Sequence, residues 1–150
     1  MNDPTDATDA TAATHELAAG IRVAVARLSR RLRAEKAVDD LSDSQYSVLA
    51  YLVREGPRAV GQLSEFERVT PPSMNRTVNC LVDAGYVERM STPEDGRKVL
   101  VQTTESGRAL VTETRRRRDA WLVRRLEELA PAQREALAEA TRIIRELADS

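Results

Sequence analysis

The sequence predicts a mainly α-helical protein that carries one small β-hairpin, and three observations support this class. Apolar residues recur at steps of three and four near both ends of the 150-residue chain, which is the period of amphipathic helices. Hydrophobic residues make up 41% of the sequence but aromatic residues only 3%, so the core is aliphatic and suits packing of helix on helix. Turn-forming residues between two strand-like segments, 86–89 and 99–101, predict the hairpin.

The N-terminal part divides into a tail and a helix. Residues 1–14 repeat small, polar and acidic residues, a composition that predicts a disordered tail. From His15 the pattern becomes helical, and we expect an amphipathic helix over residues 15–37. Its apolar stripe consists of Leu17, Ile21, Val25, Leu28 and Leu32.

The middle of the chain begins with a capping-box pattern. Ser42 and Gln45 are spaced so that each side chain can accept a hydrogen bond from a free backbone amide at the start of a helix. This helix is expected to end at Gly56-Pro57. A helix of about two turns is predicted around residues 62–66.

The segment 70–84 predicts the helix that carries function. Thr70 is placed to cap it, and Pro71 stands at the first helical position, where its missing N–H costs nothing. An apolar stripe faces inward, and Gly85 ends the helix. The stripe consists of Met74, Val78 and Leu81. The remaining face is polar and consists of Ser73, Asn75, Arg76, Thr77, Asn79 and Cys80, of which all but Cys80 are candidates to contact DNA.

Together with the hairpin that follows, this helix predicts a winged helix-turn-helix. The second helix of such a motif reads base edges in the major groove, where arginine pairs with guanine and asparagine with adenine. The hairpin turn carries Asp95, Arg97 and Lys98, and we expect Arg97 to enter the minor groove. Asp95 is expected either to hydrogen-bond the backbone of the turn or to brace Arg97. Residues 38–107 are therefore predicted to form the DNA-binding domain.

Long helices are expected after the hairpin, over residues 108–149. Apolar residues recur at helical spacing before and after Pro131, which starts the last helix. These residues are Leu110, Trp121, Leu122, Leu126, Leu129, Leu137, Ile144 and Leu147. Because such stripes need a covering surface, we interpret residues 15–37 and 108–149 as a dimerisation region. The basic run 115–118 points around the helix and is interpreted as solvated surface.

These segments resemble the MarR family of bacterial transcription regulators. The turn Asp95-Gly96-Arg97 is similar to the family's Asp-x-Arg wing motif, and Gly107 matches a downstream glycine. The run from Leu81 to Arg89 follows the family's Leu-x-x-x-Gly-x-Val-x-Arg pattern. Thr103-Thr104 departs from the family's Leu-Thr, which weakens one core contact.

The resemblance implies a homodimer that binds double-stranded DNA at a pseudo-palindromic, inverted-repeat operator, usually as a repressor. It also implies that a small aromatic or phenolic ligand, or an oxidant, relieves repression. The family's effector pocket lies where the dimerisation helices meet the winged domain, so Tyr46, Tyr51 and Trp121 are candidates to line it. Core packing explains these three aromatic residues equally well.

Two alternative functions remain open at this point. The first is a redox-sensing regulator that signals through Cys80, the only cysteine. We interpret Cys80 instead as a small, half-buried residue, because the family's oxidant sensors carry their cysteine near the first helix. The second alternative is a winged-helix protein-interaction module that does not bind DNA. An arginine at the wing tip argues against it.

Several classes of protein are not supported by the sequence. It shows no nucleophile–base pair, metal-ligand cluster or phosphate-binding glycine loop, so we expect neither an enzyme nor a bound cofactor or metal. No apolar run is long enough to cross a membrane, and no secretory signal is evident, so we expect a cytoplasmic protein. The net charge of −1 means that any DNA-binding surface must be a local basic face.

Overall fold

The computed structural model describes residues 4–38, 40–91 and 99–149, with side chains described from residue 10 onward. The chain forms two compact units, residues 1–35 and residues 36–150, and each is described separately. Within the first unit, helix α1 runs over Pro4–Arg33. The described part of the second unit contains five further helices and three short strands.

Helix α1 begins earlier and ends earlier than we expected. Residues 4–14, predicted to be a disordered tail, belong to the helix, and the helix ends at Arg33 instead of near Ala37. Four of the first ten residues of this helix are alanine, the best helix former, so local propensity favours helix although nothing there predicts a core contact. Arg31 and Glu35 form an ion pair of 3.0 Å beside the helix end.

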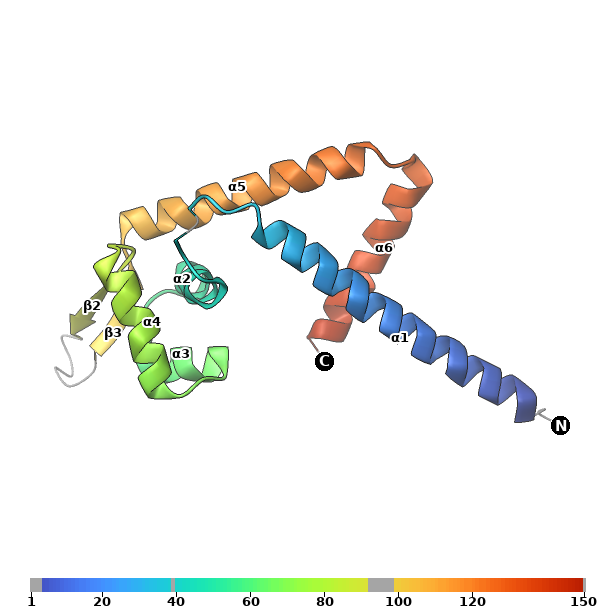
Figure 1. Ribbon diagram of the computed structural model, residues 1–150, viewed down its shortest axis with the longest axis horizontal. Helices are drawn as coiled ribbons and strands as arrows, with labels where there is room; N and C mark the ends of the chain where they lie inside the picture. The colour runs from blue at the N-terminus through green and yellow to red at the C-terminus, as the bar shows by residue number, and fades with distance from the viewer. Residues whose placement is uncertain (1–3, 39, 92–98, 150) are drawn as a thin grey trace. The chain divides into compact units, whose positions relative to one another are not determined.

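Figure 1 shows the helices and strands of the second unit, which follow one another as a helix, a short strand, two helices, a hairpin and two long helices. Their bounds are α2 Asp43–Glu55, β1 Arg58–Ala59, α3 Val60–Glu67, α4 Pro71–Asp83, β2 Val87–Ser91, β3 Val99–Thr103, α5 Glu105–Glu127 and α6 Pro131–Ala148.

Helix α2 starts and stops as the sequence predicts. The Ser42 hydroxyl accepts a hydrogen bond from the Gln45 amide (3.2 Å), and the Gln45 side chain accepts one from the Ser42 amide (2.8 Å). This reciprocal pair is the predicted capping box. The helix ends at Glu55, and Gly56 adopts a φ of 80°, a conformation that glycine tolerates without a steric penalty.

The sheet has one more strand than the predicted hairpin. Strands β2 and β3 pair antiparallel, with Val87 opposite Thr103 and Arg89 opposite Val101. The two-residue strand β1 pairs with the other edge of β3, so the strand order is β1-β3-β2. The sequence predicted no strand there, because two residues carry no readable periodicity. Strand β1 exists because β3 supplies its hydrogen-bond partners.

The core of the second unit is aliphatic and lies where α2, α3, α4, the sheet and the start of α5 meet. Three of its buried residues form the predicted stripe of α4. The buried apolar residues are Leu41, Val48, Leu49, Leu52, Leu63, Met74, Val78, Leu81, Val87, Val101, Leu110 and Val111. Each fully buried aliphatic side chain of this kind stabilises the fold by about 1.5–3 kcal/mol, so this core can hold the winged part together.

The start of α5 fits closely against the turn after α4. The Thr104 hydroxyl donates to the Gly85 carbonyl (2.7 Å) and accepts from the Gly107 amide (3.1 Å), so it caps α5. A Cβ atom on Gly107 would clash with the Tyr86 carbonyl oxygen, which explains why glycine fits there. Thr103, where we expected a weaker core contact than leucine gives, is buried beside them.

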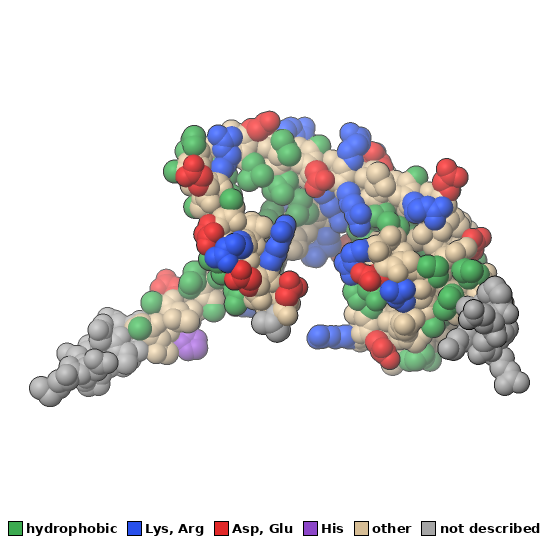
Figure 2. All heavy atoms as spheres, turned by 180° about the vertical axis from the view of Figure 1, so that it is seen from behind, with side chains coloured by type: hydrophobic (Ala, Val, Ile, Leu, Met, Phe, Trp, Pro, Cys, Tyr) green, Lys and Arg blue, Asp and Glu red, His purple; other side chains and the backbone are tan. Residues whose placement is uncertain are grey.

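The long C-terminal helices expose much of their apolar surface. Helix α6 has no buried residue, and the exposed side chains of α6 and α5 include Leu137, Ile143, Ile144, Leu147 and Val123. Figure 2 shows hydrophobic side chains at the surface of this region. Within the described residues, no helix combines the length and the apolar character that crossing a membrane requires.

Candidate nucleic-acid interface

Helix α4 is the second helix of a helix-turn-helix, and α3 is the first. In the turn between them, Arg68 has a φ of 54°, and the amide of Val69 donates to the Ser64 carbonyl (3.0 Å). Pro71 opens α4 as predicted. Thr70 stands at the N-cap position, but its side chain makes no capping hydrogen bond, so that part of our expectation is wrong.

The polar face of α4 divides into two parts because of the way the helix packs. Ser73 and Arg76 are exposed, and the Arg76 side chain makes no hydrogen bond or ion pair with any residue that the structure describes. Thr77 is half-buried, and its hydroxyl lies 3.4 Å from the Ser73 carbonyl. This first part of the face therefore exposes the Arg76 guanidinium and the Ser73 hydroxyl in the N-terminal half of the helix.

The second part of the face contacts the wing. Asn75 and Asn79 lie one turn apart, and the Arg89 guanidinium from strand β2 donates to both side-chain oxygens. The Nη2–Oδ1 distance is 2.8 Å to Asn79 and 3.4 Å to Asn75. The amide nitrogen of Asn75 also donates to the Pro71 carbonyl (3.1 Å). Both asparagines lie on the polar face as expected, Asn79 exposed and Asn75 half-buried, and the sequence did not predict their contact with Arg89.

Arg89 reaches α4 because of the register of the sheet. Side chains alternate along a strand, so Arg89 lies on the same face as buried Val87 and opposite buried Val101. Glu88 lies on the other face, where its carboxylate accepts a hydrogen bond from Gln102 (2.6 Å). Arg89 was not among the site residues predicted from the sequence, although it stands at the last position of the run from Leu81 to Arg89.

Three predicted wing residues, Asp95, Arg97 and Lys98, lie outside the described residues. Their expected positions at the DNA remain predictions. The flanking strands are paired, Val87–Ser91 with Val99–Thr103.

Cys80 is exposed on α4, whereas we expected it to be half-buried. The apolar stripe of α4 faces the core at Met74, Val78 and Leu81, and Cys80 lies outside that stripe. It is a free cysteine. An oxidant can therefore reach its sulfur without local unfolding.

The three aromatic candidates for an effector pocket have different partners. The Arg118 guanidinium lies 4.4 Å from the centre of the Tyr46 ring. Tyr51 stacks on Phe66 of α3 with ring centres 4.0 Å apart. Trp121 is half-buried on α5, with Arg125 5.8 Å from its ring centre. Their effector role remains a prediction, because packing within the chain accounts for each position.

The basic run of α5 makes local ion pairs, which agrees with our interpretation of a solvated surface. Arg116 and Arg117 both bind Glu113, with nitrogen–oxygen distances of 2.8 Å. Hydrogen bonds from Arg116, which has the larger effect, and from Arg117 lower the pKa of Glu113 to about 2. Arg117 also donates to the Lys36 carbonyl (2.9 Å), and Thr114 accepts from the Ala37 amide (3.3 Å). These bonds tie the segment before α2 to α5.

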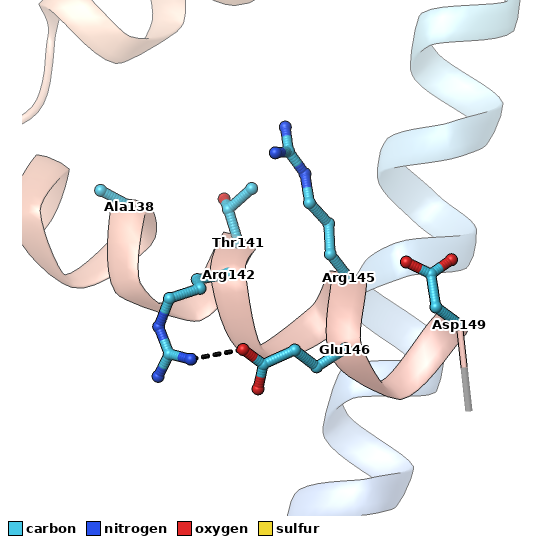
Figure 3. Close-up of a pocket in the computed structure, with 6 residues that line it drawn as sticks. All are labelled: Ala138, Thr141, Arg142, Arg145, Glu146 and Asp149. Carbon is cyan, nitrogen blue, oxygen red and sulfur yellow. Dashed lines mark hydrogen bonds and ion pairs between the residues drawn. The ribbon is translucent and has the colours of Figure 1, made fainter.

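A shallow hollow on α6 does not match the predicted effector site. Figure 3 shows its six lining residues, among which Arg142 forms an ion pair with Glu146 (2.5 Å). None of the three aromatic candidates lines it. The part of the chain that the structure describes also contains no group of three or more histidine, cysteine or acidic side chains able to hold a metal ion.

The fold and the polar face of α4 define a winged helix-turn-helix protein. A MarR family model matches residues 39–98. Over 133 residues the chain is 44% identical to an HTH-type transcriptional regulator from Mycobacterium leprae, and the match covers 89% of this chain and 93% of the relative.

Solved structures show the same fold. A MarR family protein from Bacillus stearothermophilus matches with a TM-score of 0.81 at 21% identity, over 93% of this chain and 98% of that chain. An S. aureus MepR mutant, solved bound to an oligodeoxyribonucleotide, matches with a TM-score of 0.68 at 17% identity, over 87% of this chain and 97% of that chain.

The chain belongs to the MarR family of HTH-type transcription regulators. The resemblance stated from the wing and helix motifs is confirmed. The members of this family are transcription regulators and not enzymes, as the sequence analysis expected.

Proposed function

We propose that this chain is a homodimeric, sequence-specific DNA-binding regulator that represses transcription from an inverted-repeat operator. The exposed face of α4 carries this proposal, because the Arg76 side chain on it has no hydrogen-bond or ion-pair partner among the described residues. A small aromatic or phenolic ligand would relieve repression, as the family resemblance implies.

The charge and the position of Arg76 favour a DNA contact at α4. An exposed arginine without an acidic partner keeps its full capacity for a bidentate bond to guanine. Arg76 stands in the N-terminal half of α4, the part that helix-turn-helix proteins place against base edges. Ser73 adds a hydroxyl beside it, and Arg97 and Lys98 of the wing are proposed to contact the minor groove and the phosphates. Because the net charge of the whole chain is −1, this local face is the feature that would attract DNA.

The apolar surface of α6 favours association with a second copy of the chain. This 18-residue helix has no buried residue in the single chain, yet Leu137, Ile144 and Leu147 are spaced for one apolar stripe. Helices in proteins gain most of their stability from packing such a stripe, so α6 needs a partner surface. An identical stripe on a second copy supplies it and gives two recognition helices for two half-sites.

The DNA part of the proposal is tested by selecting bound duplexes from a random-sequence pool at near-physiological salt. We expect wild type to enrich an inverted repeat with half-site centres about one helical turn, roughly 34 Å, apart. Arg76→Ala should lose discrimination at one base position per half-site, at a cost of about 1–3 kcal/mol. Arg124→Ala, which removes an exposed arginine of α5, is the matched control. No enrichment by wild type would contradict sequence-specific binding and favour a protein-interaction module.

The dimer is tested by light scattering coupled to size-exclusion chromatography. Ile144→Asp places a charge in the apolar stripe of α6 and should shift the protein towards monomer. Ala138→Asp places the same charge on the opposite side of α6 and should leave the dimer intact. An equal fraction of monomer in the two variants would contradict a dimer formed through α6.

The ligand response is tested separately, by adding benzoate or phenol to the protein–operator complex and measuring fluorescence anisotropy. Release of DNA by either compound supports relief of repression by an aromatic ligand. The exposure of Cys80 favours redox sensing as the second candidate. In that case hydrogen peroxide, and neither aromatic compound, should release the DNA.

A further inference from the structure

We propose that Arg89 is a positioning residue that sets the base preference of the recognition helix by withholding two asparagines from adenine. This inference rests on the proposed DNA-binding function, and it concerns which side chains of α4 are able to read bases. Its basis is the contact between strand β2 and helix α4, in which one guanidinium binds both asparagine side chains of the helix.

The hydrogen bonds determine how each amide is oriented. Arginine has only donors, so the atom that each asparagine turns towards Arg89 must be its oxygen, Oδ1. Asn75 uses its other end as well, since its Nδ2 donates to the Pro71 carbonyl (3.1 Å). The protein therefore sets the amide plane of Asn75 from both sides. Asn79 keeps its Nδ2 group for an outside partner, while its Oδ1 is held at 2.8 Å by Arg89.

Adenine would have to compete with Arg89 and Pro71 for these amides. Asparagine recognises adenine with two parallel bonds, in which Oδ1 accepts from the base N6 amine while Nδ2 donates to N7. Such a pair needs a side chain that is free to turn its amide edge towards the base. In this protein the edge of Asn75 is engaged at both ends, and the oxygen of Asn79 is shared with a cation. Turning either amide to adenine breaks bonds that the DNA-free protein already makes.

The remaining face of α4 is therefore the part that reads bases. Arg76 and Ser73 are exposed and are not held by Arg89. Arg89 also connects the wing to the recognition helix, because it is part of β2 and bonds to α4. A displacement of the wing would thus change the orientation of the amide groups on α4. Arg89 acts on the DNA sequence preference through Asn75 and Asn79 and not through a base contact of its own.

The first test is done without DNA and detects the contact in which the Arg89 guanidinium binds the Asn75 and Asn79 side chains, here called the clamp. The side-chain amide signals of Asn75 and Asn79 are identified in ¹⁵N-correlated NMR spectra by their loss in Asn75→Ala and Asn79→Ala. We expect Arg89→Ala to shift both pairs of signals. Glu88→Gln is the matched control, because Glu88 lies on the same strand but binds Gln102 on the other face. Unchanged amide signals in Arg89→Ala would overturn the proposal whether or not the protein binds DNA.

The second test repeats the duplex selection with Arg89→Ala, Arg89→Lys and Asn79→Ala. Release of the amides in Arg89→Ala should raise the preference for adenine at one or two positions per half-site by about 5- to 150-fold, the range of a good bidentate pair. Arg89→Lys should behave like Arg89→Ala, because the shorter lysine side chain keeps the charge but does not bring its ammonium to the position of Nη2, the atom that binds both oxygens. Adding Asn75→Ala and Asn79→Ala to Arg89→Ala should abolish the new preference.

Two results would overturn the base-reading role. One is that Arg89→Ala keeps the sequence preference of wild type but binds all duplexes more weakly and with a smaller salt dependence, while Arg89→Lys restores binding. This is the behaviour of a phosphate contact. The other is a wild-type adenine preference that disappears in Asn75→Ala. A wild-type protein that selects no duplex contradicts the proposed function and the base-reading role with it, while the amide signals decide whether the clamp exists.

Discussion

Replacing Gly107 with alanine should destabilise the winged part of the protein. The added Cβ would clash with the Tyr86 carbonyl oxygen and lie 3.1 Å from Cδ1 of Leu49. The carbonyl cannot move freely, because it accepts a hydrogen bond from the Thr104 amide (3.0 Å). Relief of the clash therefore requires either that α5 moves away from the turn or that this hydrogen bond breaks.

The magnitude follows from three contributions. Overpacking of a buried site costs about 1–3 kcal/mol, and loss of the Thr104 hydrogen bond adds about 0.5–1.5 kcal/mol. Alanine recovers up to about 1 kcal/mol because it is a better helix former than glycine. We expect a net loss of about 0.5–4.5 kcal/mol in the free energy of unfolding. For a chain of this length, each kcal/mol lowers Tm by roughly 2–4 °C.

The assay is urea unfolding followed by circular dichroism, at one protein concentration because a dimer's stability depends on it. Gly61→Ala is the matched control, since it lies in helix α3 and an added Cβ there meets no atom within 4 Å. It should be neutral or should stabilise the protein by up to about 1 kcal/mol. If Gly107→Ala is as stable as Gly61→Ala, the close contact with Tyr86 does not exist in solution and the reasoning fails.

Four further predictions follow from single residues. Glu113→Gln removes a carboxylate whose pKa is lowered to about 2, so its stabilising effect should be present above pH 4.5 and lost as the pH falls towards 2; unfolding of wild type and variant across that range checks this. Ser42→Ala removes the N-cap of α2 and should cost about 0.5–2 kcal/mol in urea unfolding, and no loss would contradict the capping box. Arg97→Ala should weaken operator binding by about 1–3 kcal/mol, and unchanged binding in an anisotropy titration would refute the wing assignment. Cys80→Ser should leave the response of DNA binding to peroxide unaltered; a variant that becomes resistant would show that the exposed thiol is a redox switch.

Local signals were sufficient to predict the elements of the winged part. The Ser42–Gln45 spacing predicted the start of α2, and the structure shows both hydrogen bonds of the capping box. The inward stripe of α4 was also predicted correctly, because a helix buries residues at a period that the sequence displays. Thr70 shows the limit of such signals, since it has the expected position but its side chain makes no capping hydrogen bond.

Contacts between distant parts of the chain were not predictable in the same way. Strand β1 depends on β3, some 40 residues later, for its hydrogen bonds, so its own two residues carry no sign of it. The contact between Arg89 and Asn79 is similar, because it depends on the register of β2 against β3 and on the side of α4 that faces the sheet. Helical periodicity only separated the polar face of α4 from the apolar face.

The sequence by itself determined the class of fold, the order of its helices and hairpin, and the family, because periodicity, caps and turn motifs are properties of short segments. The tertiary structure decided which polar residues of α4 remain available to a ligand. Arg89 does not bind Ser73 or Arg76, which are exposed, whereas it binds the side chains of half-buried Asn75 and exposed Asn79. The physical reason is that a side chain's hydrogen-bond partners depend on which elements pack against it, and packing brings together residues that are far apart in the chain.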